Sequence, residues 1–192
     1  MPTDEAKPVP EELELISSFV NTLHRSVDAG TPDVEQLASP EALRSWMRER
    51  GIAVGDDLGA RDLESAIEFR EALRMLLWSN NGAKLDPGAL RALRDASQEG
   101  LIRVEIDSAG QAVARPARTG AGALFARLLA AVADSQAAGS WERIKACAAE
   151  DCQWAFYDHS RNRSRAWCTM EVCGNRAKTR AYRTRRRQNR DS

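Results

Sequence analysis

Hydrophobic residues recur at helical spacing through much of the first 140 residues. Between residues 11 and 28 they lie three or four positions apart, at Leu13, Ile16, Phe19, Val20 and Leu23. This period predicts an amphipathic helix over 11–28 that ends near Gly30. The same period over residues 60–79 predicts a long helix, which the segment Asn80-Asn81-Gly82 would end.

Two further helices are indicated by their first residues. Ser39 followed by Pro40 is typical of a helix start, with serine as the N-cap and proline in the first turn, and Gly51 would close that helix. Asp86 and Pro87 repeat the start signal for another short helix. The N-terminal part of the chain is therefore predicted to be mostly helical.

A two-residue period replaces the helical one after residue 100. Two interleaved sets alternate there, Leu101, Arg103 and Glu105 with Ile102, Val104 and Ile106. The turn-forming segment Ser108-Ala109-Gly110 separates this stretch from residues 111–115, so a β-hairpin is predicted. The alanine- and leucine-rich run 122–138 predicts a last helix that buries most of its surface.

These elements predict an α+β protein whose N-terminal domain is mostly helical with one β-hairpin. We expect this domain to span residues 11–139, after a disordered tail of residues 1–10, with Ala138-Gly139-Ser140 as the boundary. A chain of 192 residues is long enough for one ordinary core and a small module, but not for two full domains. Residues 140–192 are that module.

The composition is that of a globular protein, with 43% apolar and 29% charged residues. The longest apolar stretch, 121–133, is interrupted by Arg127, so we expect no contact with a membrane interior. The first twenty residues lack the basic patch, apolar run and cleavage site of a secretory signal. We therefore expect a cytoplasmic protein, in which stable disulfides are rare.

The net charge of zero hides an acidic body and a basic C-terminal part. Residues 141–192 contain 13 Lys and Arg against 6 Asp and Glu, a net +7, which leaves 15 basic and 22 acidic residues, a net −7, in 1–140. This division suggests a polyanionic partner for the basic part. The alternative is that the two halves attract each other or keep the protein in solution.

All four cysteines fall after the predicted boundary, in two pairs with four residues inside each pair and fifteen between the pairs: Cys147, Cys152, Cys168 and Cys173. Such a gap lets one tight turn present two sulfurs to a single ion, so two pairs predict one tetrahedral Zn²⁺. A shell of four thiolates leaves no position for an activated water, which indicates a structural ion. Two disulfides, four unrelated buried thiols or an iron–sulfur cluster are the alternatives.

The tetrapeptide Cys173-Gly174-Asn175-Arg176 is the one that names the CGNR zinc-finger family, and residues 141–187 resemble that family. The similarity lies in blocks that follow in order, 141–147, 154–158, 165–168 and 175–178. The N-terminal part resembles the ABATE domain usually found before this finger, through 19–23, 37–40 and 70–74. The resemblance implies a bacterial, stress-linked, DNA-binding transcription regulator whose four cysteines bind zinc.

Residues 175–189 contain no Gly or Pro and are predicted to form a helix that leaves the zinc site. Five arginines recur at steps of four and three and share one face: Arg176, Arg180, Arg183, Arg187 and Arg190. Lys178 widens this basic strip. Because no acid lies between the first and last of these arginines, we expect an anion from outside the chain to relieve their repulsion. Nucleic-acid phosphate, in duplex DNA, is the natural candidate, and a merely solvated helix is the alternative.

The fifteen residues between the cysteine pairs contain aromatic and then basic residues. We predict that Trp154, Phe156 and Tyr157 form the small core of the module. The three arginines that follow in a turn-like segment are predicted to add to the nucleic-acid surface: Arg161, Arg163 and Arg165. We expect Asp158 to pair with one of them and hold the loop in place.

No signature of catalysis is present. His24 is expected inside the first helix, His159 has no partner motif, and the glycine signatures of hydrolases and nucleotide-binding enzymes are missing. The leading hypothesis is a regulator that binds DNA through its finger while the body senses a small-molecule ligand or forms a homodimer. The alternative is an adaptor whose basic finger binds an acidic protein surface.

Overall fold

The computed structural model describes residues 8–27 and 30–188, and of residues 184, 187 and 188 it describes the backbone alone. The predicted tail therefore falls mostly outside the described residues, although Val9 packs against the core. The body contains five helices: α1 (Glu11–Val20), α2 (Pro40–Glu49), α3 (Ala60–Ser79), α4 (Pro87–Glu99) and α5 (Gly120–Ala137). No helix in the described ranges is long and apolar enough to cross a membrane.

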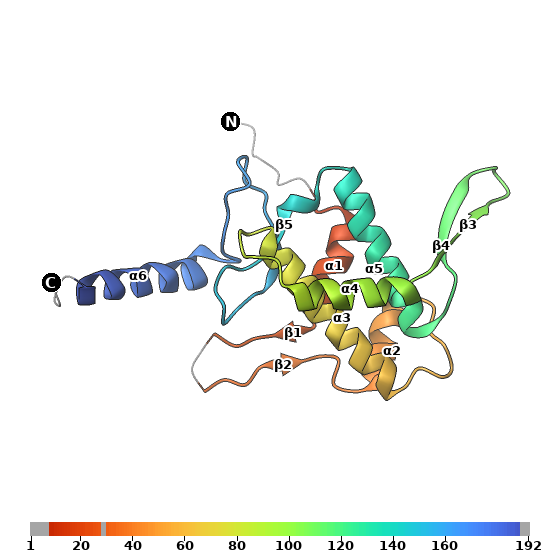
Figure 1. Ribbon diagram of the computed structural model, residues 1–192, viewed down its shortest axis with the longest axis horizontal. Helices are drawn as coiled ribbons and strands as arrows, with labels where there is room; N and C mark the ends of the chain where they lie inside the picture. Colours follow the sequence, from red (N-terminus) through yellow and green to blue (C-terminus); the bar gives the residue numbers. More distant parts are fainter. Residues whose placement is uncertain (1–7, 28–29, 189–192) are drawn as a thin grey trace.

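Three antiparallel strand pairs complete the fold: β1 (Leu23–His24) with β2 (Val34–Glu35), β3 (Ile102–Ile106) with β4 (Ala112–Pro116), and β5 (Ile144–Ala146) with β6 (Ala155–Tyr157). The short helix η1 (Trp141–Arg143) precedes β5, and the π-helical turn η2 (Met170–Gly174) leads into α6 (Asn175–Gln188). The α+β class is thus confirmed. Figure 1 shows α6 at one end of the long axis and the β3–β4 hairpin at the other.

The predicted helix starts are confirmed at atomic detail. The side chain of Ser39 accepts a hydrogen bond from the backbone N–H of Ala42 at 3.2 Å, and that of Asp86 accepts one from Ala89 at 2.7 Å. Gly51, after the end of α2, has a φ of +64°, which glycine adopts without steric cost. Local capping therefore sets where α2 and α4 begin and where α2 ends.

The core lies between α1, α3 and α5. Three phenylalanines stack through it, with ring centroids of Phe19 and Phe69 6.2 Å apart and those of Phe69 and Phe125 4.8 Å apart. The ring of Trp46, from α2, packs against that of Phe19, with the ring centroids 5.2 Å apart. Eleven of the residues of α5 are buried, which confirms that this helix packs most of its surface.

The first helix is shorter than its apolar period predicts. It ends at Val20, and Leu23 and His24 belong to β1 instead of a helix reaching residue 28. The cause is tertiary, because the carbonyl of Val20, which would accept a helical hydrogen bond, accepts one from the Arg74 guanidinium at 2.6 Å. Asn21 meanwhile exchanges two hydrogen bonds with the backbone of Ala155, at 2.9 and 2.8 Å.

The C-terminal module shares its core with the body. Trp141, Ile144, Ala146 and Ala155 belong to the same cluster of buried apolar residues as the body helices. The end of α3 also holds the module, since the Asn81 amide donates to the carbonyls of Ala146 and Ala166 at 2.9 and 2.7 Å. Asn81, from the segment that was predicted to end the helix, therefore also holds the C-terminal module in place.

Candidate metal centre and nucleic-acid interface

The four cysteines converge at the junction of β5, β6 and η2. Cys147 follows β5, Cys152 lies in the turn before β6, and Cys173 lies within η2. The four sulfur atoms all lie within 4.8 Å of one another, with Sγ–Sγ distances of 3.7 Å for Cys152–Cys168 and for Cys168–Cys173. A tetrahedron with Zn–S bonds of about 2.3 Å has edges of about 3.8 Å, so the donor set fits one zinc ion.

The pKa values of the four thiols depend on one another. Hydrogen bonds from Cys152 and Cys168 lower the pKa of Cys147 to about 2. Hydrogen bonding with Cys147 raises the pKa of Cys152 and brings that of Cys168 to about 12, while burial raises the pKa of Cys173. Four sulfurs this close repel one another as thiolates, so a divalent cation among them is what allows all four to deprotonate.

Apolar side chains cover the sulfur cluster. Phe156 is buried with the cysteines, and Val27, Trp154 and Trp167 pack against them. The His24 ring meets Trp154 edge-on at 5.1 Å, from β1 instead of the predicted helix. The predicted aromatic mini-core is therefore confirmed for Phe156 and Trp154, and Tyr157 packs on the main core. The shell of four sulfurs, which leaves no position for a water ligand, indicates a structural ion.

Asp158 holds the basic loop, but its partner is not an arginine side chain as predicted. The buried carboxylate accepts hydrogen bonds from the Lys145 ammonium at 2.8 Å and from the backbone N–H groups of Ser160 and Arg165 at 2.9 Å. Lys145 lies on β5 and also donates to the carbonyl of Arg163, within the loop, at 2.5 Å. Burial alone would raise the pKa of Asp158, but the hydrogen bonds from Lys145 and Ser160 lower it to about 2.

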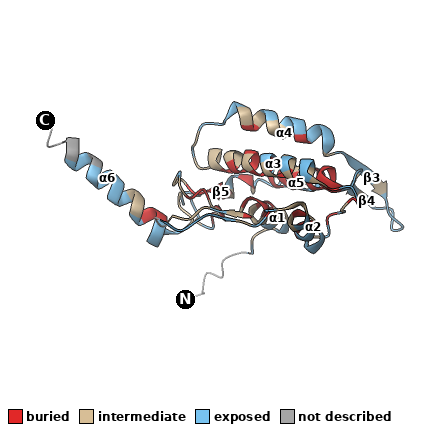
Figure 2. Cartoon of the chain, turned by 90° about the horizontal axis from the view of Figure 1, so that it is seen from below, coloured by how far each residue is buried: buried red, intermediate tan, exposed pale blue. Residues whose placement is uncertain are grey.

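The predicted C-terminal helix is confirmed as α6, which projects from the zinc centre. Figure 2 shows it leaving the body, and its described side chains beyond residue 177 are exposed. Arg176 and Arg180 both pair with the carboxylate of Asp151, which lies between Cys147 and Cys152. For these two arginines, Asp151 therefore supplies the negative charge that was expected from outside the chain.

The other residues predicted to bind nucleic acid divide into groups. Lys178 and Arg183 are exposed on α6; the side chain of Arg187 and the whole of Arg190 lie outside the described residues. In the loop, Arg161 is exposed, Arg163 pairs with Glu142, and Arg165 donates to the carbonyls of Trp167 and Cys168. The Arg165 guanidinium also lies 5.1 Å from the centre of the Phe156 ring.

Sequence reasoning missed two buried arginines of α3, of which Arg74 joins the body to the finger and Arg70 holds β2. Arg74 is fully buried and donates to the carbonyl of Gln153, next to Cys152, at 3.0 Å. Arg70 forms a bidentate pair with Glu35, with both N–O distances 2.7 Å. Although burial would raise the pKa of Glu71, Arg74 and Arg70 lower it. The only sequence signal was the presence of two arginines in the 70–74 block that resembles the ABATE domain.

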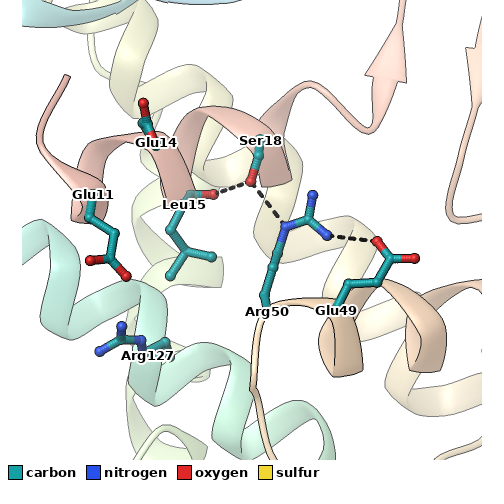
Figure 3. Close-up of a pocket in the computed structure, with 7 residues that line it drawn as sticks. All are labelled: Glu11, Glu14, Leu15, Ser18, Glu49, Arg50 and Arg127. Carbon is teal, nitrogen blue, oxygen red and sulfur yellow. Dashed lines mark hydrogen bonds and ion pairs between the residues drawn. The ribbon is translucent and has the colours of Figure 1, made fainter. Parts of the chain in front are cut away.

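A hollow of about 420 Å³ lies on the body between α1, the end of α2 and α5 (Figure 3). Its lining combines carboxylates and guanidinium groups: Glu11, Glu14, Leu15, Ser18, Glu49, Arg50 and Arg127. Arg50 donates to the Ser18 hydroxyl at 3.4 Å and pairs with Glu49 at 3.3 Å. No sequence motif indicated this hollow, because its residues come from three separate elements.

A mostly helical α+β body joined to a four-cysteine centre and a basic helix defines a zinc-finger protein with one structural zinc. The family model for ABATE, described as "Putative stress-induced transcription regulator", matches residues 13–139, and that for the CGNR zinc finger matches 143–186. The chain belongs to the ABATE family and carries a CGNR zinc finger. No curated protein matches the chain.

Proposed function

We propose that this protein is a bacterial, cytoplasmic transcription regulator that binds duplex DNA through α6 and the loop 161–165. One observation carries the proposal: the sequence of α6, NRAKTRAYRTRRRQ, has seven basic residues and no acid, on a helix that projects from the zinc centre. An exposed helix of this charge suits the DNA major groove, where arginine contacts both phosphates and guanine edges.

The zinc centre would position this helix. Asp151 ties Arg176, at the start of α6, to the turn between the first two cysteines. Arg176 is thus proposed to orient the helix, while Lys178, Arg183 and Arg187 contact the nucleic acid. The loop is anchored by Lys145, and its exposed pair of Arg163 with Glu142 is of a kind that contributes little and can yield to phosphate.

The adaptor hypothesis is less well supported. It assigns the anchor to the aromatic residues between the cysteine pairs, yet Phe156 is buried against the cysteines and Trp154 packs on the same cluster. Aromatic anchors of protein interfaces fill a pocket on the partner and must be exposed before binding. Competition between an acidic peptide and DNA for the finger would separate the two hypotheses.

Salt dependence tests the DNA proposal. We expect the affinity for a random-sequence duplex, measured by fluorescence anisotropy, to fall with salt at a log–log slope of about −0.9 per phosphate contact. Replacing Lys178, Arg183 and Arg187 with alanine should weaken binding and make the slope less negative by about 1 per lost contact. A control variant with alanine at Arg48, Arg91 and Arg94, exposed on the body, should bind like the wild type. Binding that does not respond to salt would refute the proposal.

We also propose that the hollow in Figure 3 is where the body senses a ligand. Its volume lies in the range of small-molecule sites, and its mixture of carboxylates and guanidinium groups suits a small zwitterion. Screening free amino acids by thermal shift should reveal a stabilising compound. Its effect should disappear in Arg127→Ala and persist in Arg94→Ala; absence of any stabilising zwitterion would argue against this site.

A further inference from the structure

The β3–β4 hairpin has one wholly apolar face. The register places the three large apolar residues of β3 directly opposite smaller apolar residues of β4: Ile102 with Pro116, Val104 with Ala114, and Ile106 with Ala112. The β3 side chains are exposed by 44%, 67% and 69%. Exposure of consecutive large apolar side chains on one face is typical of surfaces that associate with another protein chain.

The hairpin is also small for a structure that stands away from the body. Figure 1 shows it projecting at the end opposite α6, and among the described residues β3 pairs with β4 alone. Two isolated strands are marginally stable in water, and three or more with an apolar face are needed for independent stability. Additional strands would therefore stabilise it.

The backbone pattern shows which groups of β3 are available to a further strand. Leu101 accepts a hydrogen bond from Ala117 at 2.8 Å, and Asp107 donates one to Gln111 at 2.9 Å, so odd-numbered residues of β3 bond to β4. Because an antiparallel ladder alternates, the N–H and C=O groups of Ile102, Val104 and Ile106 point to the outer edge. That edge presents three donors and three acceptors.

The opposite edge of the hairpin is less suitable. By the same alternation Pro116 of β4 is at an outward position, where it offers no N–H, and proline is typical of edges that do not pair. β4 is also the strand that contacts α5. The open edge is therefore that of β3.

We propose that two copies of this chain pair through their β3 edges, antiparallel about a two-fold axis at Val104. In this register Val104 lies opposite its counterpart and Ile102 opposite Ile106 of the other copy, all positions whose backbone groups point outward. Six backbone hydrogen bonds would join the copies, two for each of three pairs. The result is a four-stranded sheet, the size at which a sheet with an apolar face becomes stable.

Charge complementarity selects this register. The axis at Val104 places Arg103 of each copy opposite Glu105 of the other, on the polar face of the sheet, where opposite charges across strands are stabilising. A parallel pairing in register would instead place each arginine opposite an arginine. The arrangement does not depend on the proposed DNA binding, and it would place the two basic helices at the far ends of the dimer (Figure 1).

Sedimentation equilibrium of the zinc-loaded full chain tests the proposal. We expect a dimer in the wild type and a monomer in Val104→Pro, whose lost N–H points outward and contributes nothing to the hairpin. Arg103→Glu should weaken the dimer about tenfold, because two attractive pairs become repulsive, and Arg103→Glu with Glu105→Arg should restore it. Arg103 and Glu105 also pair with each other within one copy, at 2.5 Å, so the rescue is combined with the cysteine crosslink below, which reports the contact between copies directly.

A cysteine scan gives an independent readout. Val104→Cys should form a symmetrical disulfide under mild oxidation, since paired residues at this position have Cα atoms about 5.5 Å apart, within disulfide reach. Ala112→Cys, exposed on β4 but separated from its counterpart by the two β3 strands, should not. A monomeric wild type, or a dimer that Val104→Pro and Arg103→Glu leave unchanged, would overturn the proposal.

Discussion

At the scale of single residues, the buried ion pair of Asp158 and Lys145 organises the loop between the two cysteine pairs. Both side chains are buried, exposed by 0% and 5%, and the carboxylate accepts three hydrogen bonds that organise the loop up to Arg165. Removing one partner of such a pair leaves the other charge buried without compensation. The pair therefore converts a flexible polar segment into a defined surface next to the zinc centre.

Asp158→Asn should reduce the free energy of unfolding at pH 7 by about 3 kcal/mol. The folded pKa of about 2 lies below the unfolded value, so the contribution of Asp158 is present above about pH 4 and is lost as the pH falls toward 2. The difference between variant and wild type in urea unfolding should therefore shrink over this window. Asp95→Asn, exposed on α4, serves as the control; an equal effect of both substitutions would contradict the prediction.

The cysteines support a second prediction at this scale. Cys168→Ser replaces a sulfur that lies 3.7 Å from two others with a poor zinc ligand, so the metal should be lost to a chelator that leaves wild-type zinc bound. Metal content by mass spectrometry measures this loss. The neighbouring exposed change Thr169→Ser should retain one zinc per chain, and retention by Cys168→Ser would exclude it as a ligand.

At the scale of elements, α3 organises the whole fold. Its first part packs in the core through Phe69, its buried arginines reach β1, β2 and the finger, and its terminal asparagines hold β5. A single helix thus connects the body with the turn that presents Cys152. Arg74 provides donors for the carbonyls of Val20 and Gln153, which would otherwise be buried without these partners.

Arg74→Met should destabilise the protein by about 3–5 kcal/mol, because it removes one of the partners of Glu71 and leaves the carbonyls of Val20 and Gln153 without their donor. Arg94→Met, on the exposed side of α4, should change stability by less than about 0.5 kcal/mol. Chemical unfolding measures both. Hydrogen exchange should also accelerate around Gln153 in Arg74→Met, and unchanged exchange there would mean that Arg74 does not join the body to the finger.

At the scale of the whole molecule, the finger and the body share one hydrophobic core. Trp141, Ile144, Ala146 and Ala155 fill the same core as Phe19 and Leu77, although they lie on the far side of the predicted boundary. Removing zinc should therefore lower the stability of the whole chain, since a bound metal stabilises whatever folds with its site.

Calorimetry with and without a chelator checks this expectation. The zinc-loaded protein should unfold in a single transition, which moves to lower temperature on chelation and returns when zinc is added back. Two separate transitions, with the body unfolding at the same temperature in both samples, would show that the finger is an independent unit.

The sequence alone determined the features that depend on neighbouring residues. Ser39 and Asp86 start helices because their side chains bond N–H groups three residues away, and the two-residue period around Val104 specifies a hairpin. The spacing of the cysteines predicted a zinc site for the same reason, since each pair comes from one short turn or loop. Such signals are local, so they can be recognised in the sequence without knowledge of the rest of the fold.

Only the tertiary structure decided the features that depend on residues distant in the chain. The end of α1 at Val20 is set by Arg74, the partner of Asp158 is Lys145 from β5, and the charges of Arg176 and Arg180 are balanced by Asp151. In each case a buried or crowded polar group pairs with a group that lies near it in space. The two partners are 13 to 54 residues apart in the sequence, so no periodic pattern of residues indicates the contact.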